Sequence, residues 1–288
     1  MKKYSIFTDS SCDMSKDMIK EKGIISIPLS FSFDGDKHIY YDGEASLKDF
    51  YDRIRNGDVA KTSAANPEDF IKAFKIYLDR GEDILYLGFS SGLSTTYNSA
   101  RLAADYLMRE NPESKIITID TLAASAGMAL LIDLIIDKKN IGASIDEVAE
   151  FAERIKLNIC HWFTVDDLDY LKRGGRISPT SAFFGNMLGI KPLLHVDNDG
   201  HLINTQKIRG RRLALETMAK KCADTIDTAF PRIAYISHAD CYDDAETLKG
   251  ILMAKYAIET KLITNVGAVI GSHSGPGTLA LFFVGKER

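Results

Sequence analysis

Residues 88–99 read GFSSGLSTTYNS and lie between an apolar run at 84–87 (ILYL) and a helix-like stretch at 100–108. This order predicts a strand, a polar loop and a helix. The loop carries seven hydroxyl side chains, whereas one helix needs only one N-cap. Because the first turn of a helix offers free N–H groups and the positive end of its dipole, such a loop suits an anionic ligand. Capping of the helix alone is the alternative interpretation.

The flanking sequence repeats this alternation of strands and helices. Strands are expected at 4–7, 24–33, 38–41 and 115–119, and helices at 15–21, after Ser46, after Asn66-Pro67 and at 122–138. Thr62 and Ser63 lie just before the Asn66 helix, where neither is needed as its cap. The pattern predicts a mostly parallel sheet with helices on its faces. Ligands of such sheets bind at the carboxyl ends of the strands, where Asp9, Ser90 and Asp120 lie.

The second half of the chain predicts another α/β unit. An amphipathic stretch at 144–157 is expected to connect an amino-terminal α/β domain (1–157) to a carboxy-terminal domain with a mixed sheet (158–288). The carboxy-terminal domain should hold a strand at 159–165, a hairpin at 191–207 around the Asn198-Asp199-Gly200 turn, and a last strand at 279–284. Residues 271–278 (GSHSGPGT) predict a polar loop that carries His273. A helix is expected from Ser178, rich in the apolar residues Phe183, Phe184, Met187 and Leu188.

Composition excludes several classes of protein. The net charge of −4 over 288 residues argues against a nucleic-acid-binding protein. The longest apolar run, 122–132, is far shorter than the roughly 20 residues that a membrane helix needs, so membrane insertion is not expected. The four cysteines are widely spaced, which indicates neither a disulfide framework nor a zinc site. We therefore expect a cytoplasmic protein without a metal or other cofactor, in which the basic run 207–212 is a solvated entry to a helix.

Hydrolysis is the enzyme hypothesis that the sequence supports best. Residues 88–92 match Gly-x-Ser-x-Gly after a strand, and Ser90, Asp120 and His273 occur in the order of an α/β-hydrolase triad. Against this, residues 92–94 delay the helix that should follow a nucleophile directly, and no His-Gly-Gly segment precedes it. A serine hydrolase of acyl esters that uses Ser90 thus stays the alternative. A carboxylate held without chemistry needs only hydroxyl donors and an apolar pocket.

Motifs along the whole chain resemble those of the DegV family of bacterial fatty-acid-binding proteins. They are TDS at 8–10, TS at 62–63, SSGLS at 90–94, LKRGGRI at 171–177, KP at 191–192 and HSGPG at 273–277. The resemblance implies a two-domain α/β fold with a long-chain fatty acid between the domains. It implies that Thr62 and Ser94 bond the carboxylate, with head-group neighbours Ser63, Ser91, Gly92 and His273. At the position of Thr95 the family often has Gly.

The resemblance also implies a partner. Members of the fatty acid kinase system present the bound carboxylate to a separate ATP-dependent kinase, which makes the acyl phosphate. An arginine of the 172–176 loop takes part in that engagement, and Arg173 and Arg176 are the two candidates. The loop is expected to be exposed at the domain surface. Its alternative role is that of a cationic helix C-terminus, with Gly174 ending the helix.

Overall fold

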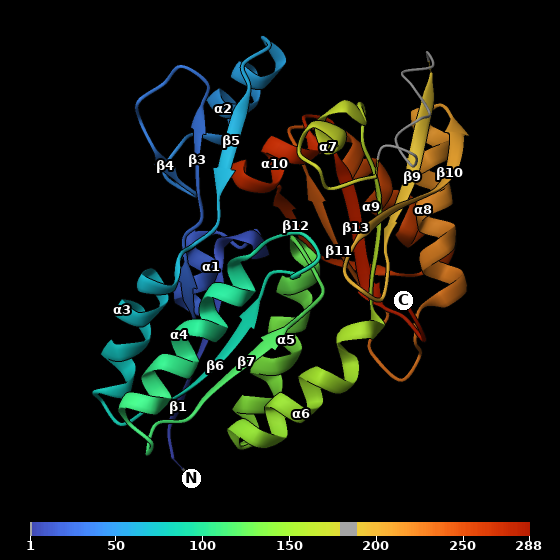
Figure 1. The fold of residues 1–288 in the computed structure, drawn as a ribbon. Helices are drawn as coiled ribbons and strands as arrows, with labels where there is room; N and C mark the ends of the chain where they lie inside the picture. The colour runs from blue at the N-terminus through green and yellow to red at the C-terminus, as the bar shows by residue number, and fades with distance from the viewer. Residues whose placement is uncertain (1, 179–188) are drawn as a thin grey trace.

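The computed structural model describes residues 2–178 and 189–288. A four-stranded parallel sheet, sheet A, forms the centre of the first half (Figure 1). Its order is β2-β1-β6-β7, with bounds Ile25–Ile27, Tyr4–Asp9, Asp83–Gly88 and Ile116–Asp120. Helices α3 (Pro67–Leu78) and α4 (Thr96–Glu110) cover one face, and α6 (Ile145–Ile155) covers the other. The aromatic rings of Phe7, Phe70, Phe74 and Tyr86 fill the space under α3.

Three helices of the first half begin at the capping residues that the sequence indicated. Asn66 and Asp69 form a capping box with Pro67 in the first turn of α3, and Ser46 caps α2 (Leu47–Arg55). Ser15 likewise caps α1 (Lys16–Glu21). Side-chain oxygens therefore satisfy the otherwise unpaired amides that begin these helices.

A small antiparallel sheet, sheet B, extends above sheet A in the order β4-β3-β5 (Figure 1). Its strands are Tyr40–Tyr41, Ser30–Phe33 and Ala60–Ser63. The prediction of one strand over 24–33 is wrong, because the chain leaves sheet A at Pro28, which has no N–H to donate, and enters sheet B. The sequence did not predict β5, which pairs with β3 and places Thr62 opposite Phe31.

A six-stranded mixed sheet, sheet C, forms the second half. Its order is β10-β9-β8-β13-β11-β12, and among these described strands the β11–β12 pair is parallel while the other pairs are antiparallel. The strand bounds are Leu202–Arg209, Ile190–Val196, Ile159–Thr164, Leu279–Val284, Ile233–His238 and Glu259–Asn265. Helices α8 (Arg211–Thr225) and α9 (Tyr242–Tyr256) cover its outer face (Figure 1). The predicted α/β class, with one parallel and one mixed sheet, is confirmed.

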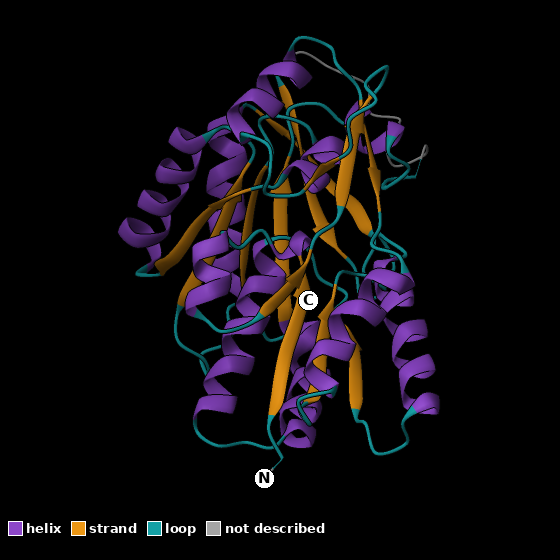
Figure 2. Cartoon of the chain, turned by 90° about the vertical axis from the view of Figure 1, so that its left-hand side faces the viewer, coloured by secondary structure: helices purple, strands orange, loops and turns teal. Residues whose placement is uncertain are grey.

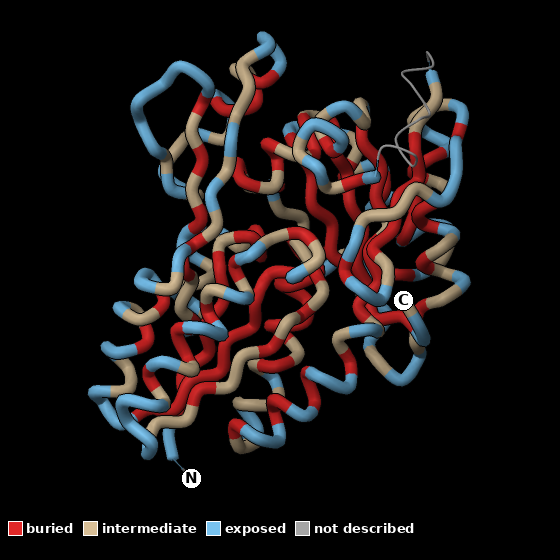
Figure 3. The backbone as a smooth tube through the Cα atoms, viewed as in Figure 1, coloured by how far each residue is buried: buried red, intermediate tan, exposed pale blue. Residues whose placement is uncertain are grey.

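Helix α5 (Ala126–Asn140) joins the two halves. It packs on β8, β11 and β13 of sheet C, and its residues share one buried core with the inner face of sheet A. Figure 2 shows helices on both sides of the strands. Strands β1, β6, β11 and β13 at the centre of the two sheets are almost entirely buried (Figure 3). The helix begins at 126 rather than at the predicted 122. The amides of residues 122, 123 and 124 instead bond the side chains of Asp120, Thr121 and His161. The domain boundary at 157/158 stays a prediction. Helix α5 comes before this boundary in the chain, but it packs on sheet C of the second half.

Four short helices complete the described chain: η1 (Ser10–Cys12), η2 (Lys156–Asn158), α7 (Asp169–Arg173) and α10 (Ala268–Ser274). The prediction of a loop over 271–278 is wrong for residues 271–274, which belong to α10 and place His273 in its last turn. The helix expected from Ser178, with Phe183, Phe184, Met187 and Leu188, falls outside the described residues. Within residues 2–178 and 189–288, no helix is long and apolar enough to cross a membrane.

Candidate functional site

A cavity of about 490 Å³ lies between the loops of sheets A and B and the inner face of sheet C. This volume is typical of a pocket for a small organic ligand. The polar side chains of the lining include Thr62, Ser63, Ser91, Ser94, Arg176 and His273, here called the polar part, and further ones are Ser125, His161, Ser237, Ser274 and Thr278. Apolar side chains line much of the rest, among them Leu29, Phe89, Phe163, Val269, Ala280 and Phe282. The lining therefore suits a ligand with one polar end and a hydrocarbon body.

Thr62 and His273 form the centre of the polar part. β5 presents Thr62 and the last turn of α10 presents His273, with 2.7 Å between Thr62 Oγ1 and His273 Nε2. Burial, with the nearby charges of Arg176 and Arg173, lowers the pKa of His273 to about 4. The imidazole is therefore neutral at pH 7. Gly174 packs against this ring, since a Cβ there would lie 2.3 Å from Nδ1.

Ser94 lines the cavity and lies just before Thr95, the N-cap of helix α4. Its Oγ accepts a hydrogen bond from the Thr96 amide at 3.2 Å and lies 2.9 Å from Thr96 Oγ1. Thr95 makes no side-chain capping bond, so capping of α4 does not account for the hydroxyls of this loop. Ser91, Gly92 and Thr95 line the cavity beside it. Thr95 has φ −81°, so its position does not require glycine.

Two carboxylates, the buried Asp9 and the partly exposed Asp120, fix the loop that carries Ser94. Asp9, at the end of β1, accepts bonds from the Phe89 amide at 3.0 Å and from Tyr86 Oη at 2.6 Å. Asp120, at the end of β7, accepts a bond from the Ser91 amide at 3.1 Å. Burial raises the pKa of Asp9 even though these bonds oppose the shift. The loop is therefore held from below by two strands of sheet A.

The hairpin turn of sheet C closes over the same loop. Gly200 has φ +78°, and a Cβ there would lie 2.1 Å from Ser90 Oγ. A Cβ on Gly92 would lie 2.8 Å from the Asp199 carbonyl oxygen. Both glycines are needed for the backbones of the two halves to approach this closely.

The hydrolase residues do not come together as a triad. Ser90 is fully buried, and its hydroxyl donates to the Gly200 carbonyl at 2.9 Å. Within the described part of the chain, the recorded hydrogen bonds of Asp120 go to backbone amides, and that of His273 goes to Thr62. Ser90 is also absent from the described cavity lining. This geometry gives a nucleophile neither a base nor access to a substrate.

The two candidate arginines differ in exposure. Arg173 is exposed at the end of α7, with its guanidinium 4.9 Å from the centre of the Tyr170 ring. Arg176 is half-buried and lines the cavity, and its Nε donates to the Leu93 carbonyl at 3.1 Å. The expected exposure thus fits Arg173 and not Arg176. Sequence reasoning missed the cavity position of Arg176, because the turn at Gly174-Gly175 reverses the chain toward the loop at 93.

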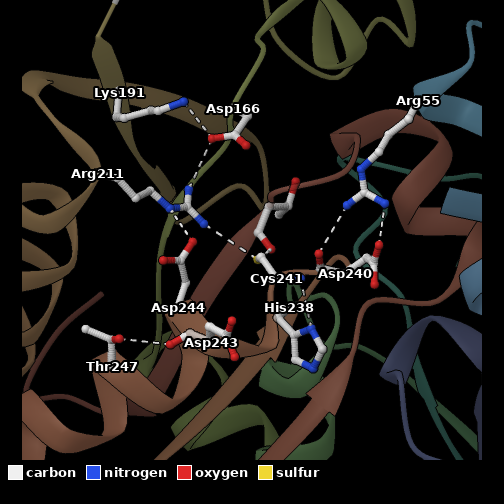
Figure 4. A network of polar contacts seen from close by, with 11 residues as sticks. Arg55, Asp166, Lys191, Arg211, His238, Asp240, Cys241, Asp243, Asp244 and Thr247 are labelled. Carbon is white, nitrogen blue, oxygen red and sulfur yellow. Dashed lines mark hydrogen bonds and ion pairs between the residues drawn. The ribbon is translucent and has the colours of Figure 1, made fainter. Parts of the chain in front are cut away.

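A polar network lies at the end of sheet C, apart from the described cavity lining (Figure 4). Arg211 pairs with Asp244 at 2.8 Å and with Asp166 at 3.6 Å, while Lys191 reaches Asp166 at 2.6 Å. The side chain of Arg211 is only 19% exposed. Within the basic run 207–212, Arg211 is therefore engaged in structural ion pairs.

Comparison with known proteins identifies the family. A family model described as "Uncharacterised protein, DegV family" matches residues 3–286. This chain belongs to the DegV family. It is 43% identical over 289 residues to a DegV domain-containing protein of Clostridium perfringens, covering 100% of this chain and 99% of the relative.

Two further relatives are named for what they bind. The chain is 35% identical over 292 residues to a fatty acid-binding protein of Thermotoga maritima, with 99% of each chain covered. Its structure matches that of a fatty-acid-binding DegV family protein from Thermus thermophilus with a TM-score of 0.86 and 29% identity. That alignment covers 97% of this chain and 98% of the other.

Proposed function

We propose that this DegV-family protein binds a long-chain fatty acid and holds its carboxylate with hydroxyl side chains. The observation that carries the proposal is the Thr62–His273 pair, with Ser94 in the same polar part of a cavity whose remaining lining is largely apolar. A fatty acid has the same division between one charged end and a hydrocarbon chain. The fatty-acid-binding relatives support this assignment.

The head group would be held mainly by neutral donors. Thr62 and Ser94 donate hydroxyl protons, and His273 is neutral and bonds Thr62. Hydrogen bonds to an ionised oxygen are worth about 1.5–3 kcal/mol each. Of the described residues that line the cavity, Arg176 alone carries a full positive charge, and because its guanidinium already donates to the Leu93 carbonyl it would neutralise the carboxylate only in part.

The protein is proposed to act as a carrier subunit that offers the carboxylate to a separate fatty acid kinase. Arg173 supports this role by its position. It is exposed, and the next residue, Gly174, packs against His273 of the polar site. A partner that binds Arg173 would therefore stand over the carboxylate. The guanidinium offers directional bonds to acidic or phosphate groups on that partner.

Mass spectrometry of a denaturing extract tests the binding proposal. Protein purified from cells should release close to one fatty acid per chain. The matched variants are Thr62→Ala and, as a control, Ser99→Ala, which removes a hydroxyl from α4 outside the described lining. An empty wild-type protein that hydrolyses acyl esters, and loses that activity on Ser90→Ala, would instead establish the hydrolase.

A further inference from the structure

Strand β13 runs along the cavity and begins close to the helix that carries His273. Thr278 just before this strand, and Ala280 and Phe282 within it, line the cavity with alternate side chains. Thr278 Oγ1 donates to the carbonyls of Ser274 and Gly275, at the end of the helix that carries His273. Phe282 lies four residues further on, roughly 13 Å away at about 3.3 Å per residue. Phe282 is therefore at the far end of this wall from His273.

His161 stands opposite Phe282 at that far end. The two residues are paired across β8 and β13, with ring centres 5.2 Å apart in an edge-to-face arrangement. His161 Nδ1 donates to the Ile159 carbonyl at 2.9 Å, and Nε2 accepts from the Ala124 amide at 3.3 Å. Burial lowers the pKa of His161 well below its ordinary value, so Nε2 is free to accept. The backbone thus holds this ring on two sides.

Helix α5 closes the space behind both rings. A Cβ on Gly127 of α5 would lie 2.3 Å from His161 Nε2 and 2.9 Å from the Cδ1 atom of Phe282. Neither ring can retreat toward α5 when a ligand presses on it. We infer that His161 and Phe282 form the end wall of the cavity in the strand direction and set the upper limit of acyl-chain length. This inference rests on the proposed binding of a fatty acid with its carboxylate near Thr62 and His273.

The wall has a measurable consequence for selectivity. Each methylene that enters the apolar lining gains about 0.8 kcal/mol, or roughly fourfold in affinity. The gain stops when the chain reaches His161 and Phe282, because further methylenes must bend across the sheet or displace the fixed rings. Affinity should therefore rise with chain length to a maximum and then level off or fall.

The experiment measures dissociation constants of delipidated protein for myristic, palmitic, stearic and arachidic acid. His161→Ala should move the maximum to longer chains, with roughly fourfold tighter binding for each methylene newly accommodated. Gly127→Ala should move it to shorter chains, since the added methyl group pushes both rings into the cavity. His195→Ala is the matched control. His195 lies on the neighbouring strand β9, bonds the His161 carbonyl at 3.1 Å, stacks on Trp162 and is not in the described lining.

Thermal unfolding would show whether His161→Ala folds. If it does not fold, Phe282→Leu, a milder change of the same wall, tests whether the maximum moves to longer chains. An unchanged chain-length profile in the folded wall variants would overturn the inference while leaving fatty-acid binding intact. A shift in His195→Ala equal to that in His161→Ala would also overturn it, because the effect would then come from sheet C as a whole. If the wild type binds none of the four acids, the proposed function itself fails.

Discussion

His273 should make the stability of the ligand-free protein depend on pH. The perturbation is His273→Gln, which keeps an amide near Thr62 but removes the titrating ring. Burial lowers the pKa of His273 from 6.5 to about 4. Between these values the unfolded chain binds more protons than the folded one, so the free energy of unfolding rises with pH in this window. The contribution is present above pH 6.5 and is lost as the pH falls toward 4.

The size of the effect follows from the same pKa. A lowering from 6.5 to about 4 corresponds to about 3 kcal/mol, at 1.36 kcal/mol per pH unit. This is an upper figure, because the imidazole is only half-buried and solvent screens part of the interaction. Other titrating groups, among them His161, contribute equally to wild type and variant and cancel in the difference.

The assay is urea unfolding of delipidated wild type and His273→Gln at several pH values between about 4 and 8. The difference in unfolding free energy should be constant above pH 7 and should shift against the wild type by up to about 3 kcal/mol toward pH 4. His201→Gln is the control, since that side chain is 59% exposed. A difference that does not vary with pH would refute the buried neutral imidazole and its place in the head-group site.

Three further predictions concern the head-group hydroxyls, the exposed arginine Arg173 and the carboxylate of Asp42. Removing either head-group hydroxyl, as in Thr62→Ala or Ser94→Ala, should weaken fatty-acid binding by about 1.5–3 kcal/mol in a calorimetric titration without unfolding the protein; wild-type affinity in both would place the site elsewhere. Arg173→Ala should lower acyl-phosphate formation with the cognate kinase while leaving the amount of bound lipid unchanged. The control is Arg109→Ala, at an exposed arginine of α4, which should alter neither quantity. Loss of bound lipid together with a lower melting temperature in Arg173→Ala would show that Arg173 has a structural role instead. Asp42 accepts a hydrogen bond from the Ala268 amide at 3.1 Å, and burial raises its pKa from 3.8 to about 6. Between these pH values the folded state binds more protons than the unfolded state, so the free energy of unfolding falls as the pH rises from about 4 to 6. Asp42→Asn should therefore be more stable than wild type at neutral pH by up to about 3 kcal/mol, and it should show no gain in stability below pH 4. Chemical unfolding at several pH values measures the difference. An equal difference at all pH values would contradict the raised pKa of Asp42.

The sequence predicted the parts of the fold that local signals determine. Helix caps at Ser46 and Asn66 and the Asn198-Asp199-Gly200 turn act within a few residues, and the structure has these features where the sequence placed them. The start of α5 was predicted four residues too early, because the amides of residues 122–124 bond side chains, one of them His161 from sheet C. Strand β5 was missed for a related reason. Its partner β3 lies about thirty residues earlier, so pairing and not local pattern makes it a strand.

The candidate site was predictable in its residues more than in its geometry. Hydroxyls in excess of capping needs singled out the loop 88–99 and the pair Thr62-Ser63, and the family resemblance implied Thr62 and Ser94 as the ligands of the carboxylate. The structure places both residues in the lining of one cavity. No local pattern showed that His273 would end a helix and reach Thr62, which is 211 residues away. The apolar lining was equally hidden, because Phe163, Ala280 and Phe282 look like ordinary alternation in buried strands until sheet C meets α5.

The choice of head-group residues fits a carrier better than a permanent store. A carboxylate paired bidentately with a buried arginine would be held tightly and would be a poor nucleophile toward a phosphoryl donor. Here the proposed donors are two hydroxyls backed by a neutral imidazole, while the guanidinium of Arg176 already donates to the Leu93 carbonyl. Such a site neutralises the carboxylate only in part. In the proposed function, the acyl chain would supply most of the affinity through burial against both halves of the protein, and the carboxylate would keep the reactivity that a kinase needs.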